Sequence, residues 1–237
     1  MKKLYFIALL LGYGLTAQAQ QTIFNVPSSD ITPRHKILAQ EQVSLDEEKF
    51  QSTTTVNYGL GHNWEVGANL YNLNYLRQEH VWEHNDTTVQ TAYAPLLLIN
   101  AQKTFDLNDN LHIGVGTQTG INIAPTRRTT WVGLGYANLA GDFKDEHYKV
   151  VVGAYVGNQR YLAKGPIAGV HMGIDAGIWY QKVHILADWA TGTHEYGQVI
   201  AGVEVYLQKH LPLAIGWRRS NDDGQQALVV QLTYTPK

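Results

Sequence analysis

Ionisable side chains recur at alternate positions within apolar stretches of the second half of the chain. Asp175 and Asp188 flank a predicted tight turn at 181–183, and counting outward from that turn places them nearly opposite each other. Two carboxylates that close together tend to share a proton, which is the arrangement of a general acid. Glu204 and Arg218 fall near each other in a following pair of segments, where opposite charges predict a buried ion pair.

These residues belong to a larger polar set on one side of the alternating segments. If that side faces an enclosed lumen, three interpretations are possible: a selectivity zone, an active site at the lumen mouth, or a structural ion network. Polar interiors are normal in membrane barrels, so the pattern alone does not decide among them. The residues expected to line a solute path are Glu65, Asn69, His112, Gln118, Asp175, Asp188, Glu204, Tyr206 and Arg218. The mixture leans acidic, so strongly anionic solutes are disfavoured.

Three further patterns suggest chemistry but favour a structural interpretation. His80-Val81-Trp82-Glu83-His84 matches the H-x-x-E-H zinc-protease motif, yet zinc binding at this spacing needs a helix, and the segment falls in a predicted loop. The pairs Gly114–Gly116 and Gly133–Gly135 are followed by no helical pattern, so they are strand glycines rather than phosphate loops. No serine stands in a G-x-S-x-G context. The sequence therefore assigns no catalytic residue, no metal and no cofactor.

The N-terminus has the composition of a cleaved secretory signal peptide rather than of a membrane anchor. Lys2 and Lys3 precede an apolar run, residues 4–15, that is too short to span a bilayer as a helix. Ala17-Gln18-Ala19 then supplies the small-x-small cleavage pattern. We expect 1–19 to be the signal, 20–35 a periplasmic N-terminal segment and 36–237 the folded domain. Residues 20–34 either stay outside that domain or fold into it as a plug.

Alternation of apolar and polar residues covers most of the remaining chain. In the last segment, Leu228, Val230, Leu232 and Tyr234 share one face. Successive strand residues point to opposite faces, so the pattern predicts strands with one apolar face and one polar or glycine-rich face. Twelve segments are predicted, at 36–45, 50–61, 63–75, 91–105, 110–122, 129–140, 148–158, 168–181, 183–191, 197–208, 211–219 and 226–235.

Strand number and length predict an all-β fold, an antiparallel transmembrane β-barrel of about twelve strands. A soluble sandwich or a lipocalin-like barrel is the alternative, but such proteins usually carry more charge on their polar faces. Aromatic residues also gather near strand ends, as they do in the girdles at the two membrane interfaces. These residues are Tyr58, Trp64, Phe105, Tyr148, Tyr180, Trp189, Trp217 and Tyr234.

Composition excludes several other classes of protein. None of the 237 residues is a cysteine, which excludes disulfide scaffolds, Cys-ligated zinc, thiol catalysis and a lipid anchor on an N-terminal cysteine. The formal net charge of -2 provides no basic surface for nucleic acid. Intrinsic disorder does not fit a chain that is 44% hydrophobic and 11% aromatic.

Two stretches resemble a known group of envelope proteins. Residues 25–33, NVPSSDITP, are similar to the segment before the first strand of several bacterial outer-membrane barrels. Residues 57–67, NYGLGHNWEVG, resemble their recurring periplasmic hairpin of the form YGL-turn-x-E-x-G. Together they resemble the transporter-type barrels grouped with the phenol meta-degradation pathway outer-membrane family. The resemblance implies an envelope barrel of unspecified cargo and transfers no catalytic residue.

We therefore expect a monomeric channel or transporter for an unidentified small solute, in contact with bacterial outer-membrane lipid. Two alternatives stay open: a lipid or peptide hydrolase that uses His184 and Asp188 on the same scaffold, and a non-conducting structural or partner-binding barrel. With both termini in the periplasm, the tight connections face the periplasm and the longer ones, led by 76–90, face the outside.

Overall fold

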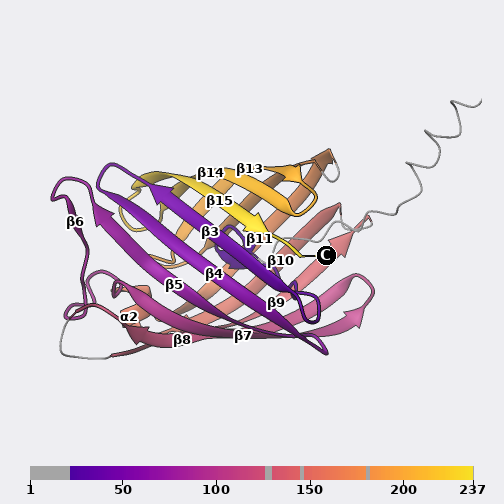
Figure 1. Ribbon diagram of the computed structural model, residues 1–237, viewed down its shortest axis with the longest axis horizontal. Coiled ribbons are helices and arrows are strands. Elements are labelled where there is room, and N and C mark those ends of the chain that lie inside the picture. Colours follow the sequence, from indigo (N-terminus) through magenta and orange to yellow (C-terminus); the bar gives the residue numbers. More distant parts are fainter. Residues whose placement is uncertain (1–21, 126–129, 145–146, 180–181, 237) are drawn as a thin grey trace, which may run out of the picture.

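A closed sheet dominates the computed structural model, which describes residues 22–125, 130–144, 147–179 and 182–236. Within these residues, twelve long antiparallel strands follow one another around the barrel (Figure 1). They are β3 (Ile37–Leu45), β4 (Lys49–Gly61), β5 (Trp64–Leu76), β7 (Leu96–Asn108), β8 (Leu111–Asn122), β9 (Trp131–Phe143), β10 (Tyr148–Gly157), β11 (Ala168–Trp179), β12 (Val183–Ala190), β13 (Gln198–Gln208), β14 (Leu211–Ser220) and β15 (Gln226–Tyr234). The last strand, β15, pairs with the first, β3, from Leu228 opposite Leu45 to Tyr234 opposite Ala39. This pairing closes the sheet and leaves no free edge.

The predicted fold class is confirmed, and each of the twelve predicted segments overlaps one of these strands. The largest difference is at β7, which the sequence places at 91–105 and the structure at Leu96–Asn108. Residues 92–94 are apolar and buried, as in a strand, but they belong to a loop that folds inward over the lumen. These residues are apolar because they are buried inside the barrel. The sequence pattern instead predicts that they belong to the wall strand.

The two ends of the barrel differ in their connections. At the short-turn end, neighbouring strands are joined by tight turns such as 62–63, 109–110 and 209–210. At the long-loop end lie the connections 77–95, 158–167, 191–197 and 221–225, which include the two-residue strand β6 (Val81–Trp82) and the one-turn helix α2 (Gln159–Leu162). Both β6 and α2 are seen together at one end of the barrel in Figure 1.

The outer wall is apolar and the inner wall is polar. Leu232 is 41% exposed on the outside, whereas its neighbours Gln231 and Thr233 point inward and are fully buried. Val203 and Val205 are likewise exposed on the outer wall. An apolar surface that surrounds the molecule is unfavourable in water and matches a lipid environment. Within the described residues, no helix is long and apolar enough to cross a membrane.

Aromatic side chains lie on this outer wall near the strand ends, as predicted. Seven of the eight predicted girdle residues have more than a third of their surface exposed, and they are Tyr58, Trp64, Phe105, Tyr148, Trp189, Trp217 and Tyr234. The eighth, Tyr180, lies outside the described residues. The arrangement places amphipathic rings at both ends of the apolar band.

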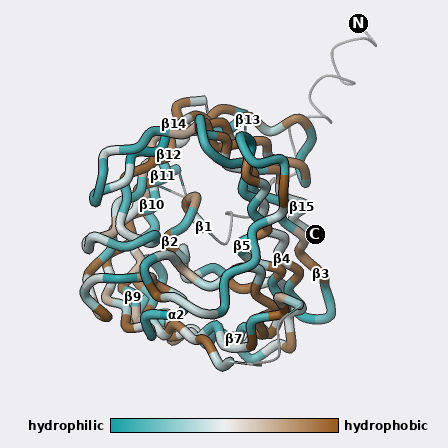
Figure 2. The backbone as a smooth tube through the Cα atoms, turned by 90° about the vertical axis from the view of Figure 1, so that its left-hand side faces the viewer, coloured by the Kyte–Doolittle hydropathy of each residue, from teal (hydrophilic) through white to brown (hydrophobic). Residues whose placement is uncertain are grey.

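The N-terminal segment lies inside the barrel. Its strands β1 (Thr22–Ile23) and β2 (Val26–Pro27) form a small hairpin within the ring of wall strands (Figure 2). Ile23, Phe24 and Val26 are almost fully buried and pack in a cluster with inward apolar residues of the wall. Of the two placements considered for residues 20–34, the described part adopts the plug. The predicted signal peptide at 1–19 lies outside the described residues.

Candidate solute path through the barrel

Asp188 holds the tip of the N-terminal hairpin. Its Oδ2 atom accepts hydrogen bonds from the backbone N–H groups of Asn25, at 2.7 Å, and Val26, at 3.0 Å. Asp188 is buried on the inner face of β12, so the two donors replace the water that a carboxylate would otherwise bind. The two hydrogen bonds fix the position of the hairpin tip.

Phe24 is seated in a notch that glycines create in the wall. Its backbone has a positive φ of 49°, which is rare for a bulky residue and directs the ring toward β13 and β14. A Cβ atom at Gly202 or Gly216 would lie 2.8 Å or 2.7 Å from the ring atom Cζ, closer than real contacts allow. The two glycines are therefore required for the ring to fit.

Glu65 holds the other end of the plug. Its Oε2 atom accepts from the backbone N–H of Thr32 at 2.8 Å and from the Thr32 hydroxyl at 2.5 Å. The Asn57 amide donates to the second carboxylate oxygen, Oε1, at 3.0 Å. The predicted YGL-turn hairpin thus places its acidic residue inside the barrel, where it binds the N-terminal segment.

Between these two anchors, the plug is attached by wall amides and an ion cluster. The Asn138 amide donates to the Pro27 carbonyl, and the Gln102 amide donates to the Asp30 carbonyl, both at 2.8 Å. The Asp30 carboxylate pairs with the buried Lys149 ammonium. Lys149 also lies 3.4 Å from Asp142.

The cluster continues to His112, one of the predicted path residues. The imidazole of His112 lies 3.4 Å from Asp142 and 2.9 Å from Asp106. Both contacts are at the short-turn end of the barrel. His112 therefore takes part in a charged network at this rim rather than lining an open passage.

The loops at the long-loop end fold inward and interlock. The Tyr93 N–H donates to the Arg160 carbonyl at 2.8 Å, which joins loop 77–95 to α2. The Glu195 N–H donates to the Leu162 carbonyl at 3.0 Å, which joins α2 to loop 191–197. The Ala92 N–H donates to the Glu195 carboxylate at 3.3 Å, which completes the circuit.

Tyrosines fill the lumen beneath these loops. Tyr71 and Tyr161 stack with their ring centres 5.4 Å apart and their planes 16° apart. Tyr155 and Tyr196 meet edge to face, with ring centres 4.8 Å apart. Inward positions on the strands supply Tyr71 and Tyr155, which alternation could have identified. Tyr161 and Tyr196 come from inward-folded loops, which alternation does not describe.

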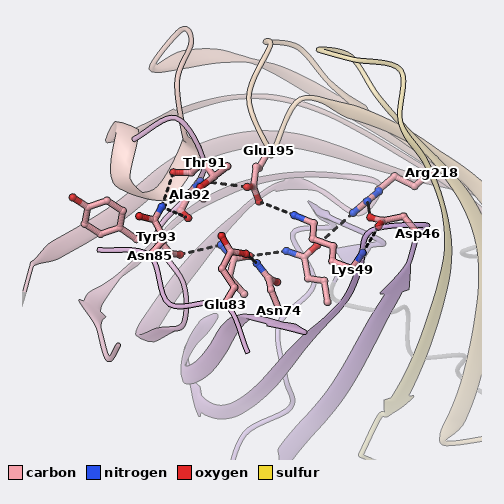
Figure 3. Close-up of polar contacts among 12 residues, drawn as sticks. Asp46, Lys49, Asn74, Glu83, Asn85, Thr91, Ala92, Tyr93, Glu195 and Arg218 are labelled. Carbon is pink, nitrogen blue, oxygen red and sulfur yellow. Dashed lines mark hydrogen bonds and ion pairs between the residues drawn. The ribbon is translucent and has the colours of Figure 1, made fainter. Parts of the chain in front are cut away.

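A cavity of about 560 Å³ lies beside the tyrosines and reaches down to Asn25 at the plug tip. On its wall, Arg218 contacts Asp46 at 3.2 Å and the Gln51 amide oxygen at 3.3 Å. Lys49 lies 3.9 Å from Glu195, so this pair joins the wall to loop 191–197 (Figure 3). Within the described residues, the cavity extends from the long-loop end of the barrel to the plug.

Carboxylates outnumber cations in the lining of this cavity. The acidic lining residues are Glu48, Glu83, Glu195, Asp222 and Asp223, and the basic ones are Lys49, Lys164 and Arg218. The acidic balance agrees with the sequence expectation, although most of the residues differ from those predicted. Lys49 and Gln51 were not among the predicted residues, although their inward positions on β4 could have indicated them.

The nine predicted path residues lie at different depths of the barrel. Arg218 lines the cavity, and none of the other eight is among its lining residues. Asn69 donates to the Gln118 amide oxygen at 3.2 Å, and the Tyr161 hydroxyl donates to the same oxygen, also at 3.2 Å. Glu65 and Asp188 hold the plug. The predicted residues thus include both plug anchors but almost none of the cavity wall.

The predicted pairings of Asp175 with Asp188 and of Glu204 with Arg218 are both wrong. Asp188 lies opposite Gly173, and Asp175 lies opposite Leu186, two positions away from the predicted register. The bulge between Gly177 and Trp179 accounts for one of these two positions. Asp175 instead contacts His184, with 2.6 Å between the carboxylate and Nδ1.

Glu204 and Arg218 do not form the predicted ion pair. Glu204 lies opposite Ala214, and Arg218 lies opposite Ile200, four residues away along β14. The positive charge of Arg218 is matched by Asp46 across the β15–β3 closure. Turn counting along the hairpin could not show this contact, because it depends on the barrel being closed.

Residues of the zinc-protease motif and of the hydrolase alternative are bound to other groups in the structure. Glu83 of the H-x-x-E-H motif accepts from the Asn74 amide at 2.8 Å, and the described residues contain no group of three His, Asp or Glu side chains suited to a metal. His184 and Asp188 are both engaged elsewhere, with Asp175 and with the plug. The site as described can hydrogen-bond a ligand and select by charge.

No protein-family model matches the chain, and no curated protein matches its sequence. Solved structures do match. The KdgM porin aligns with a TM-score of 0.60 at 9% identity, covering 84% of this chain and 99% of that one. The NanC porin aligns with a TM-score of 0.58 at 8% identity, covering 85% of this chain and 100% of that one. The fold is that of outer-membrane porins.

Proposed function

We propose that this protein is an outer-membrane channel that admits a small solute through the cavity at its long-loop end. The observation that carries the proposal is a polar cavity of about 560 Å³ enclosed by a wall whose outward side chains are apolar. Such a molecule sits in lipid and offers water-soluble compounds a polar interior, which is the design of a porin. The long-loop end faces outside, and the protein acts as a monomer.

The charges of the cavity favour neutral or cationic solutes. Five lining carboxylates face three cations, so the opening has a surplus of negative charge. Fixed charges at an opening concentrate ions of opposite sign and repel like ones. The KdgM porin has been captured with disordered oligogalacturonate, a polyanion. The acidic balance here supports a different cargo.

The N-terminal plug controls passage below the cavity. It is attached through Asp188 at its tip and Glu65 near its base, so solutes leaving the cavity meet the hairpin before they reach the periplasm. Loosening the plug should therefore raise flux. The motifs at 25–33 and 57–67 supply both the plug and its Glu65 anchor, which supports a place for this chain among the barrels of the phenol meta-degradation pathway outer-membrane family.

Swelling of liposomes that contain the folded protein tests this function. We expect neutral sugars such as arabinose to enter faster than galacturonate of similar size, and faster than they enter protein-free vesicles. Asp188→Ala should increase both rates, because it releases the plug tip. If vesicles with wild-type protein and vesicles with the variant both swell no faster than empty ones, the protein is not a channel.

A further inference from the structure

We propose that the cavity binds a neutral, polyhydroxylated solute of one to two sugar rings. This inference rests on the proposed function, because it names the class of solute taken at the same opening. The cavity volume of about 560 Å³ falls within the range of about 300–1,000 Å³ typical of small-molecule sites. Its depth, from the loop rim to the plug tip at Asn25, gives a ligand walls on several sides.

One wall of the cavity is a chain of oriented amides. Gln51 accepts from Arg218 at 3.3 Å and donates to the Asn72 side-chain oxygen at 2.8 Å. Asn72 in turn donates to the Tyr93 carbonyl at 3.2 Å. These contacts fix which way each amide points. Gln51 is half-buried and retains one N–H and one lone pair, whereas Asn72 is buried and holds Gln51 in place. A hydroxyl group both donates and accepts, so it is the ligand group that such a wall matches.

The cavity also has an apolar surface, which is formed by a tyrosine ring. Tyr71 is half-buried at the cavity wall, and its ring stacks on the buried ring of Tyr161, which holds it in place. The C–H faces of a sugar ring pack against a flat aromatic surface, while its hydroxyls point sideways to polar partners. Amides and a tyrosine platform in one cavity therefore suit a sugar better than a purely apolar or a purely ionic ligand.

The two cations inside the cavity are already paired with carboxylates. Arg218 pairs with Asp46, and Lys49 lies 3.9 Å from Glu195. The Glu83 carboxylate accepts from the Asn74 amide. Among the described lining residues, the interior thus offers no unpaired cation to bind an anionic ligand.

The remaining carboxylates lie at the rim. Glu48, Asp222 and Asp223 are exposed, as is Lys164, so the rim keeps a surplus of negative charge. The backbone N–H of Gln225 donates to Asp223 and lowers the pKa of that carboxyl, so it stays ionised. An acidic rim repels anions before they enter, and the paired cations inside offer an anion no partner. Neutral polar solutes are subject to neither of these effects.

Calorimetric titration of the complete, folded protein in detergent tests the inference. The probes are maltose, which is neutral, digalacturonate, which is anionic and of similar size, and spermidine, which is cationic. We expect saturable maltose binding and at least about tenfold weaker binding of the other two. Gln51→Leu should weaken maltose binding by about fivefold to tenfold, the effect of a lost hydrogen bond. Gln208→Leu, at the far end of the barrel, is the matched control and should leave binding unchanged.

Three results would overturn the inference: no saturable maltose binding, tighter binding of spermidine or digalacturonate, or equal weakening by Gln51→Leu and Gln208→Leu. Liposome swelling with the same preparation separates this inference from the proposed function. Swelling without saturable maltose binding leaves the channel and removes the ligand class. Maltose binding without swelling leaves the binding site and removes the channel.

Discussion

A single carboxylate, that of Asp188, carries two backbone hydrogen bonds at the tip of the plug. A typical intramolecular hydrogen bond contributes about 0.5–1.5 kcal/mol to stability. Asp188→Ala removes both acceptor contacts and leaves two buried N–H groups without a partner. We expect amide exchange of residues 22–34 to accelerate by about tenfold to a hundredfold, and channel conductance to rise with it.

Asp175→Ala is the matched control for this substitution. It also removes a buried carboxylate from the inner wall, but Asp175 contacts His184 and no plug residue in the hydrogen bonds described. Hydrogen exchange by mass spectrometry should therefore show an unchanged plug. Equal acceleration in the two variants would mean that wall charge in general, and not the Asp188 contact, holds the segment.

Phe24 and Gly216 make a second contact that can be tested as a pair. A Cβ atom at Gly216 would lie 2.7 Å from the Phe24 ring, so Gly216→Ala should push the ring out of its notch and raise conductance. Combining Gly216→Ala with Phe24→Ala should add little to Phe24→Ala alone, because the ring is already gone. Strict additivity in this double-mutant cycle would show that the two residues do not interact.

Among the elements, loop 191–197 depends on a neutral histidine. His194 Nδ1 accepts from the Gly197 N–H at 3.1 Å. Nε2 lies 3.0 Å from the Tyr155 hydroxyl, which itself donates to the Thr191 carbonyl, so Nε2 carries the proton. Burial lowers the pKa of His194 below its ordinary value, since the charged form is poorly solvated there.

The loop should therefore loosen in acid. The folded pKa of His194 lies below the unfolded value of about 6.5, so its contribution to stability is complete above that pH and is lost as pH falls through the folded pKa. We expect exchange of the amides in 191–197 to accelerate as pH is lowered from about 7 to 5, after correction for the intrinsic rate. His194→Gln should remove this dependence, and persistence of the dependence in that variant would assign it to another group.

Alternation along the strands predicted the wall because lipid and lumen impose opposite polarity on successive side chains. It also placed Glu65 and Asp188 correctly on the inner face. It could not reveal what they bind, since their partners lie 33 to 163 residues away in a segment outside the alternating pattern. Turn counting misplaced the partner of Asp175 by two positions, and the bulge at Gly177–Trp179 accounts for one of them. The cavity wall was missed because it depends on inward-folded loops and barrel closure.

For the whole molecule, the apolar outer wall predicts that the loss of stability caused by an introduced arginine depends strongly on where the arginine is placed. Val203→Arg places a charge on the lipid face and should cost about 2–4 kcal/mol near the middle of the bilayer. Val81→Arg makes the same change on exposed β6 at the long-loop end and should cost little. Urea unfolding from lipid vesicles measures both. Similar costs would contradict a wall that faces lipid.

Conductance through cysteine-substituted protein tests the central claim, that solutes pass through the lumen of a lipid-embedded barrel. The chain has no native cysteine, so Gln51→Cys introduces a single thiol on the cavity wall. Val203→Cys introduces one on the outer wall as a control. In a planar bilayer, a water-soluble cationic thiol reagent should reduce the current through the first variant and leave that through the second unchanged. Equal effects on both variants, or no current through either even when Asp188→Ala is added, would contradict the account.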